Sequence, residues 1–128
     1  MKLKQLSYLM MLGFLCVGLA KADVTTNDFM DKKTKNLINL CSASPEDPHY
    51  REAIHFCHGY LVGAYDFNTA QTNNKPEMKL FCPPNPVPSR NQVIDEFVAW
   101  VKQHPEFMDE MPVETEFRFL TAKWPCKN

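Results

Sequence analysis

Two disulfide bonds are the strongest restriction that this sequence places on its fold. Behind an N-terminal export signal the chain keeps an even number of cysteines, at Cys41, Cys57, Cys82 and Cys126. The fifth, Cys16, lies inside the signal and leaves with it. An even set of cysteines in a small exported domain is typical of a disulfide framework. We therefore predict two disulfides and no free thiol that could act as a catalytic nucleophile.

The predicted export signal occupies residues 1–22. A basic start at Lys2 and Lys4 precedes an apolar run from Leu6 to Leu19. The sequence Ala20-Lys21-Ala22 then supplies the small residues that a signal peptidase reads. The apolar run is shorter than the ~20 residues of a membrane-spanning helix, which argues against an N-terminal anchor. We predict cleavage after Ala22, an exported mature protein and no membrane attachment after cleavage.

Length and charge limit the mature chain further. The whole chain has 128 residues and a formal net charge of −1, and the predicted signal removes only basic residues from that balance. Residues 23–128 are long enough for one domain but too short for several. An acidic mature protein is a poor partner for nucleic acid, because nucleic-acid-binding proteins attract phosphates through positive charge. We predict a single domain over residues 23–128 that binds no nucleic acid.

Zinc is the main alternative to disulfides. His55, Cys57 and His58 lie close in sequence, and the two histidines could share one face of a helix. No second spaced pair of ligands follows them, and an oxidising compartment favours disulfides over thiolate ligands. The sequence also lacks a serine in an elbow motif and a glycine-rich phosphate loop. We therefore expect no metal site, no cofactor and no enzymatic activity.

Hydrophobic periodicity predicts an all-α fold, a small bundle of four main helices stapled by the two disulfides. Apolar residues recur three and four positions apart in four stretches, and each stretch follows capping or helix-starting residues. A polar gap from Asp31 to Asn36 interrupts the first stretch. The first expected helix covers residues 25–41, and the second starts within residues 44–48 and passes Ala64. The third runs from a capping box at Ser89 to Gln103 or His104, and the fourth covers residues 112–124.

Two segments are predicted to be non-helical. Residues 68–78 are polar and show no periodicity, and residues 81–88 contain four prolines. Within the second helix, Gly59 and Gly63 lie four positions apart on a shared face. Glycine inside a helix costs up to ~1 kcal/mol relative to alanine, so we predict a packing reason, the close approach of a neighbouring helix.

The order of the helices favours one of three disulfide pairings. A short connection between the third and fourth helices favours antiparallel neighbours, which would bring Cys82 near Cys126. Cys41 is then left to pair with Cys57. Each bond would stabilise the fold by roughly 3 to 4 kcal/mol in the chain-entropy model. The other two connectivities remain open from the sequence.

Five motifs stand in an order that resembles a known family. Cys41 ends the first helix, and Trp124-Pro125-Cys126 closes the chain. Between them lie three more motifs, Phe56-Cys57-His58-Gly59-Tyr60-Leu61-Val62-Gly63, Phe81-Cys82-Pro83-Pro84 and His104-Pro105-Glu106. Together these motifs resemble the Rap/Tai family, the periplasmic immunity proteins of bacterial type VI secretion systems. The resemblance covers most of the mature chain.

The resemblance implies a small helical protein that binds and blocks a peptidoglycan amidase effector. Such proteins protect the producing cell from toxin delivered by its siblings. The implied partner is therefore a protein effector, a cell-wall amidase, and because family members often form homodimers a homodimer remains open. An alternative of another class is a periplasmic stress or chaperone-like protein of the same fold, which would bind many unfolded clients weakly.

An inhibitory protein needs an exposed feature that enters or covers the cleft of an enzyme, and residues 104–112 fit this need. They contain the acids Glu106, Asp109 and Glu110 and no lysine or arginine. Phe107 and Met108 are apolar at a place where a solvated turn would be polar. Because an apolar cluster rimmed by carboxylates is typical of a binding anchor, we predict that these five residues contact the partner.

Two alternatives to this assignment stay open. Phe107 and Met111 could fold back onto the core and leave the acids in solvent. A second polar segment, residues 68–79, is also long enough to act as a binding loop, or to be a plain solvent loop.

Overall fold

Helices and the turns between them make up the described part of the chain. The computed structural model describes residues 23–30 and 32–127, and these ranges contain no strand. The predicted signal at residues 1–22 lies outside the described residues. Four helices have 8 residues or more, which confirms the all-α prediction with four main helices. The elements in chain order are α1 (Thr26–Met30), α2 (Thr34–Cys41), α3 (Tyr50–Thr72), the 3₁₀ turn η1 (Pro76–Met78), α4 (Arg90–Lys102), the 3₁₀ turn η2 (Pro105–Phe107) and α5 (Pro112–Lys123).

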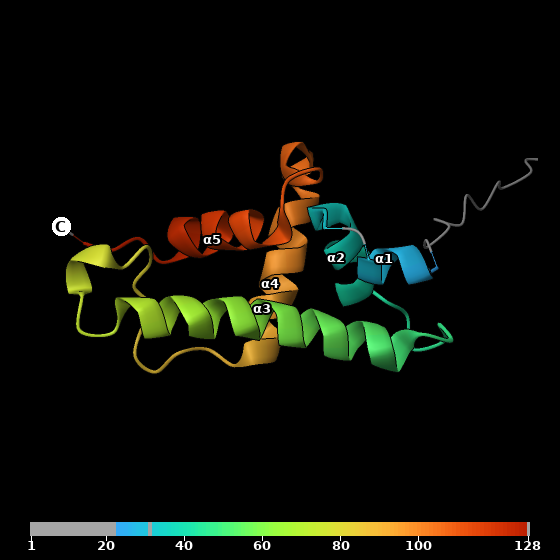
Figure 1. The fold of residues 1–128 in the computed structure, drawn as a ribbon, viewed down its shortest axis with the longest axis horizontal. Coiled ribbons are helices and arrows are strands. Elements are labelled where there is room, and N and C mark those ends of the chain that lie inside the picture. The colour runs from blue at the N-terminus through green and yellow to red at the C-terminus, as the bar shows by residue number, and fades with distance from the viewer. Residues whose placement is uncertain (1–22, 31, 128) are drawn as a thin grey trace, which may run out of the picture.

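The two helices α3 and α5 run side by side in the same direction, and α4 crosses them (Figure 1). The helices α1 and α2 pack together beside the first half of α3. The third and fourth main helices are therefore not the antiparallel neighbours that the short connection predicted. The connection itself explains the difference, because residues 103–111 form η2 and attach to α2 before Pro112 starts α5.

Both disulfides join the predicted pairs of cysteines. Cys41 at the end of α2 bonds to Cys57 in α3, with their Cα atoms 5.2 Å apart. Cys82 bonds to Cys126, with Cα atoms 4.9 Å apart. Cys82 and Cys126 were expected to meet because α4 and α5 would be antiparallel, but α4 crosses α5. They meet instead because the segment before Cys82 runs beside the end of α5. The Cys82 amide donates a 2.8 Å hydrogen bond to the Trp124 carbonyl, which holds the two segments together.

One apolar core fills the space between α2, α3, α4 and α5. The apolar face of α4 supplies Ile94, Phe97 and Val101, and all three are buried. Each fully buried large side chain contributes about 1.5–3 kcal/mol to folding, so this shared core joins the crossing helices. The remaining buried members are Leu37 and Ile38 of α2, Cys57 and Leu61 of α3, Phe119 and Leu120 of α5, and Phe81 and Trp124.

The first predicted helix is divided into α1 and α2, which are held together by the buried carboxylate of Asp28. Its Oδ2 atom accepts hydrogen bonds from the Thr25 amide at 2.8 Å, the Thr25 hydroxyl at 2.9 Å and the Asn39 side chain at 2.9 Å. Its Oδ1 atom accepts one from Asn36 at 3.2 Å. Burial raises the pKa of Asp28, but the hydrogen bonds together outweigh burial and hold it below its usual value. The Asp28 side chain thereby joins the residue before α1 to α2.

The second predicted helix begins later and ends later than expected. Residues 45–49 form turns, because Asp47 accepts hydrogen bonds from the Val24 amide at 2.8 Å and the His49 amide at 2.7 Å. At the other end α3 continues through Thr72, so the prediction of a loop over residues 68–78 is wrong for residues 68–72. Although α3 has 23 residues, no helix in the described ranges is both long and apolar enough to cross a membrane.

The packing reason predicted for Gly59 and Gly63 is also wrong. Both glycines are exposed on α3. A Cβ atom built on either one would meet nothing within 4 Å, so no helix in the described part of the chain approaches this face. The N-cap at Ser89, by contrast, forms as predicted, because the Ser89 hydroxyl accepts a hydrogen bond from the Gln92 amide at 3.3 Å. The return half of the capping box does not form, because the Gln92 side chain donates to Glu96 at 3.1 Å instead.

Candidate functional site

The segment predicted to bind a partner lies at one end of α4, and we call residues 104–112 the acidic loop. Figure 1 shows that η2, which belongs to it, projects beyond α2 and α5. Glu106 and Asp109 are exposed, whereas Phe107, Met108 and Glu110 are partly buried. The structure therefore brings the five predicted residues together on a protruding feature, but with different degrees of access.

The acidic loop is fixed to α2 by main-chain hydrogen bonds. The first amides of a helix have no partner within the helix, and α2 has no side-chain cap. The Thr34 amide donates to the Glu110 carbonyl and the Lys35 amide to the Met108 carbonyl, each at 2.9 Å. The Thr34 hydroxyl adds a 3.1 Å bond to the Glu110 carbonyl and a 2.8 Å bond to the Thr115 hydroxyl. The loop thus caps α2, and α2 in turn sets the shape of the loop.

The acidic loop rests on an aromatic stack at the end of α4. The ring of Phe107 is stacked on that of Trp100 at 5.5 Å between centroids, with 10° between the planes. His104 also stacks on Trp100, at 4.1 Å, and its Nδ1 atom lies 2.8 Å from the Trp100 carbonyl. The guanidinium of Arg118 lies 5.2 Å from the centre of the Phe107 ring. Met108 packs against the main core, whereas Met111 is 52% exposed, so of the two residues expected to fold back only Phe107 does so.

Two of the three acids in the loop form ion pairs with basic residues elsewhere in the chain. Asp109 accepts hydrogen bonds from Lys35 at 3.0 Å and Lys33 at 3.2 Å. The bond from Lys35, followed by that from Lys33, lowers the pKa of Asp109. Glu110 accepts from the Arg118 Nε atom at 2.9 Å and from its Nη2 atom at 3.3 Å. The loop sequence contains no lysine or arginine, so these cations were missed when the loop was considered alone.

A shallow depression lies beside the acidic loop on the outer face of α5. Its lining joins Trp100 and Phe107 to Phe117 and Arg118 of α5. Arg118 was not predicted as a site residue, although its position in the second turn of α5 places it within reach of the loop that precedes that helix. The acidic loop and this depression form a continuous surface with apolar, acidic and basic groups.

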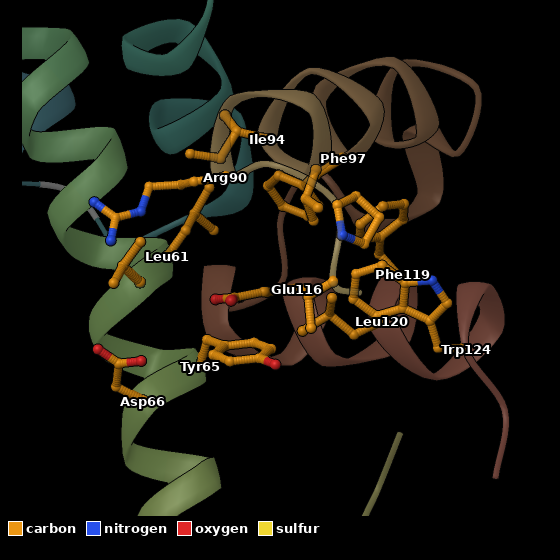
Figure 2. A pocket seen from close by; sticks show the side chains of 14 residues that line it. Leu61, Tyr65, Asp66, Arg90, Ile94, Phe97, Glu116, Phe119, Leu120 and Trp124 are labelled. Atoms are coloured by element: carbon orange, nitrogen blue, oxygen red, sulfur yellow. The ribbon is translucent and has the colours of Figure 1, made fainter. Parts of the chain in front are cut away.

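A separate pocket of about 300 Å³ lies between α3, α4 and α5 (Figure 2). Its inner wall contains Glu116, which is only 4% exposed. None of the described side chains or main-chain groups forms a hydrogen bond with the buried Oε2 atom of Glu116. Burial raises the pKa of this carboxyl to about 8. The rest of the lining is mainly apolar, with Asp66 and Arg90 also contributing.

Sequence reasoning missed Glu116, although a signal was present. The residue lies three positions after Val113 and four before Leu120, two apolar residues at helical spacing in the last helix. A glutamate at that spacing lies on the core-facing side of the helix. A charged residue on an apolar stripe is therefore a useful indicator of a buried titratable group.

The histidines considered as zinc ligands do not form a metal site with the cysteines. Cys57 is in a disulfide, and His55 and His58 are exposed and partly buried, respectively, on α3. In the described part of the chain, no group of three or more histidine, cysteine, aspartate or glutamate residues could hold a metal ion.

Comparison with known proteins gives one match. The family model for Rap1a immunity proteins matches residues 33–126. This range includes both disulfides, the acidic loop and the pocket around Glu116. No curated protein and no solved structure matches the chain.

Proposed function

The chain belongs to the family of Rap1a immunity proteins, and we propose that it is a non-enzymatic inhibitor that binds a protein effector through the acidic loop. The proposed effector is a peptidoglycan amidase, as the resemblance to the Rap/Tai family implies. The proposed place of action is the periplasm, after removal of residues 1–22. Membership of an immunity family supports the partner class, and the geometry of the loop supports the choice of surface.

The observation that supports this surface most strongly is that a projecting loop is held in one shape before any partner arrives. Main-chain bonds to Thr34 and Lys35 and the stack of Phe107 on Trp100 restrain it. A pre-organised loop loses little conformational entropy on binding, so more of the contact energy appears as affinity. An inhibitor that must act at a stoichiometric ratio benefits from this arrangement.

The exposed groups of the loop define the partner surface that would fit it. Met111 offers a flexible apolar side chain and Glu106 offers negative charge, whereas Asp109 is exposed as an ion pair with Lys33 and Lys35. An apolar anchor surrounded by charged groups resembles the core and rim of protein interfaces. The complementary surface is an apolar hollow with lysine or arginine at its edge, and the mouth of an enzyme cleft supplies such a hollow.

The first experiment is a periplasmic pull-down with the tagged, exported protein, using cells in which secretion is active. We expect one partner at a defined ratio, with peptidoglycan amidase activity that is lost when the complex forms. A partner with a different activity would contradict the amidase assignment alone. A broad and weak set of clients would contradict the immunity mechanism and favour the chaperone-like alternative. The mass of the complex from light scattering gives its stoichiometry and shows whether a homodimer forms.

The second experiment tests the loop with a matched pair of charge reversals. Glu106 follows Pro105 in η2, and Glu77 follows Pro76 in η1, so the two glutamates occupy the same position in the same kind of exposed turn. We expect Glu106→Lys to weaken effector binding by at least about tenfold, equivalent to 1.4 kcal/mol, and Glu77→Lys to leave affinity unchanged. No effect from Glu106→Lys would remove the acidic loop from the interface, and a loss from Glu77→Lys would assign binding to residues 68–79, the alternative segment. Phe107 and Met108 are unsuitable for this test because both pack against the body of the protein.

The export proposal has its own test. Mass spectrometry of the protein from the periplasmic fraction should give a chain that begins at Asp23. A full-length chain in the membrane fraction would contradict cleavage after Ala22.

A further inference from the structure

The pocket between α3, α4 and α5 has no part in the proposed effector surface, and we infer that it binds an alkylammonium group with Glu116 as its counter-ion. The group would be the amine of a small molecule or the side chain of a lysine, since both present an ammonium on an apolar stem. The inference is independent of the immunity function, because it concerns a different set of residues.

The shape of the pocket suits an apolar stem of limited length. Its volume of about 300 Å³ lies at the lower end of the range for small-molecule sites. Leu61, Ile94 and Leu120 supply aliphatic wall, and aromatic rings come from Tyr65, Phe97, Phe119 and Trp124. Aromatic faces attract cations as well as apolar groups, so this lining can hold both parts of an alkylammonium ligand.

The carboxyl of Glu116 supplies the specific contact. Figure 2 shows it extending from α5 toward α3, between Leu61 and Tyr65. Buried polar atoms in native proteins almost always have hydrogen-bond partners, because an unpaired one costs free energy. The Oε2 atom of Glu116 is buried and has no partner among the described residues. A donor on a ligand that enters the pocket would satisfy it.

Among the described residues, no cation that faces Glu116 is paired with it. On α5 itself, the residues three and four positions away are Pro112, Val113, Phe119 and Leu120, and none of them is charged. The helix α2 contributes Leu37 and Ile38 to the same core. Residues of α3 near Glu116 or along the pocket include Tyr60, Tyr65 and Asp66, and α4 contributes Arg90.

The four titratable residues near Glu116 or along the pocket are Tyr60, Tyr65, Asp66 and Arg90. In the described ranges, none of them serves as a counter-ion to Glu116. Burial is the main cause that raises the pKa of Tyr60 and Tyr65, so neither titrates near neutral pH. Asp66 and Arg90 are exposed and of opposite charge. No ion pair in the described ranges joins Arg90 to Glu116. An ammonium is therefore favoured over a neutral donor, because a hydrogen bond between two charged groups is about twice as strong.

Binding of a cation would release a proton. With a pKa of about 8, the Glu116 carboxyl is protonated in about nine of ten molecules at pH 7. An ammonium that pairs with the carboxylate displaces this proton to solvent, and the ligand keeps all of its own. Affinity should therefore rise with pH, and we expect about 50-fold tighter binding at pH 8 than at pH 6.

The test uses n-hexylamine as the probe and 1-hexanol as a control with the same stem and no charge. Calorimetric titration of the mature protein at pH 6, 7 and 8 should give the rise in affinity for the amine and no such rise for the alcohol. Repeating the pH 7 titration in two buffers of different ionisation enthalpy should show release of about 0.9 proton per amine bound. Absence of amine binding, or equal affinity for both probes at pH 8, would overturn the inference.

A matched pair of variants assigns the effect to the buried carboxyl. Glu116→Gln keeps the shape of the side chain and removes its charge, and we expect loss of at least about thirtyfold in amine affinity at pH 8. Asp66→Asn removes an exposed carboxylate from the same pocket, and its effect should stay within about threefold. Equal effects would contradict the role of Glu116. If Glu116→Gln fails to fold, the proton release of the wild-type protein decides the question by itself.

The two sources of the ammonium are separated by a third probe. Nα-acetyl-lysine N-methylamide has the side chain of lysine attached to a peptide backbone. Binding as tight as that of n-hexylamine would indicate a lysine side chain from a protein, and binding of n-hexylamine alone would indicate a free amine. No effector is present in any of these measurements, so their failure would leave the immunity proposal untouched.

Discussion

Asp28 and Glu116 both have little exposed surface, 8% and 4%, yet their environments shift their pKa values in opposite directions. Asp28 accepts hydrogen bonds from Thr25, Asn36 and Asn39, and these keep it ionised. The Oε2 atom of Glu116 accepts none from the described residues, and burial keeps the group protonated near neutral pH. Hydrogen-bond donors and depth of burial together decide whether such a carboxyl carries charge.

The same difference separates a structural carboxylate from one that is available to a ligand. Asp28 uses its acceptor capacity to join α1 to α2. Glu116 has an acceptor that nothing in the described chain uses, at the wall of a pocket. Three substitutions test this comparison, and each replaces a carboxylate with the amide of the same shape.

The largest effect is expected for Glu116→Gln, and it is stabilising. Because the folded-state pKa of about 8 is above the unfolded value of 4.5, the contribution of Glu116 is fully present below pH 4.5 and is lost as the pH rises toward 8. Glutamine needs no proton, so the variant should exceed the wild type by about 3 kcal/mol in free energy of unfolding at pH 7, relative to their difference at pH 4. Urea unfolding at the two pH values measures this.

Comparing the two pH values also removes the cost of burying an amide, because that cost is present at both. A variant whose advantage does not grow between pH 4 and pH 7 would show that Glu116 is ionised in the folded protein, and the contrast with Asp28 would disappear.

The next effect has the opposite sign. Asp28→Asn replaces one carboxylate oxygen with an amide that cannot accept, so some of the donors around it lose their partner. We expect a loss of about 2 kcal/mol in free energy of unfolding at pH 7. The folded-state pKa lies below 3.8, so the contribution of Asp28 is present above pH 3.8 and is lost as the pH falls through the lowered folded value. The difference between variant and wild type should therefore shrink in acid.

Asn36→Ala provides the control, because it removes a single donor at 3.2 Å from the same carboxylate. Its cost should be smaller than that of Asp28→Asn in the same urea titration. A larger cost would show that Asn36 stabilises the protein by means other than its bond to Asp28.

The smallest effect is expected for Asp109→Asn, which sharpens the comparison by removing an exposed carboxylate. Asp109 also has a lowered pKa, through hydrogen bonds from Lys35 and Lys33, but its side chain is 72% exposed. Water and salt screen such pairs, so the free energy of unfolding should match that of the wild type within error. Urea unfolding at low and high salt measures it. A loss of stability as large as that of Asp28→Asn would mean that hydrogen-bond donors around a carboxylate stabilise the fold even when the carboxylate is exposed.

Much of the architecture follows from signals that act over short stretches of chain. The spacing of Ile94, Phe97 and Val101 predicts α4, and Ser89 with Gln92 predicts its start, because a helix forms from contacts three and four residues apart. The even set of cysteines predicts two disulfides. The break between α1 and α2 is indicated less directly, by the polar gap after the first turn.

The properties of the candidate sites depend on contacts between distant parts of the chain. The carbonyls of Met108 and Glu110 meet the amides of Lys35 and Thr34, and no local pattern predicts that meeting. The sequence places Glu116 on an apolar face, but its protonation depends on which donors α2, α3 and α4 bring near it. Local geometry therefore decides where the helices form. Tertiary packing decides which charges are paired, because hydrogen bonding and desolvation act between groups that the fold brings together.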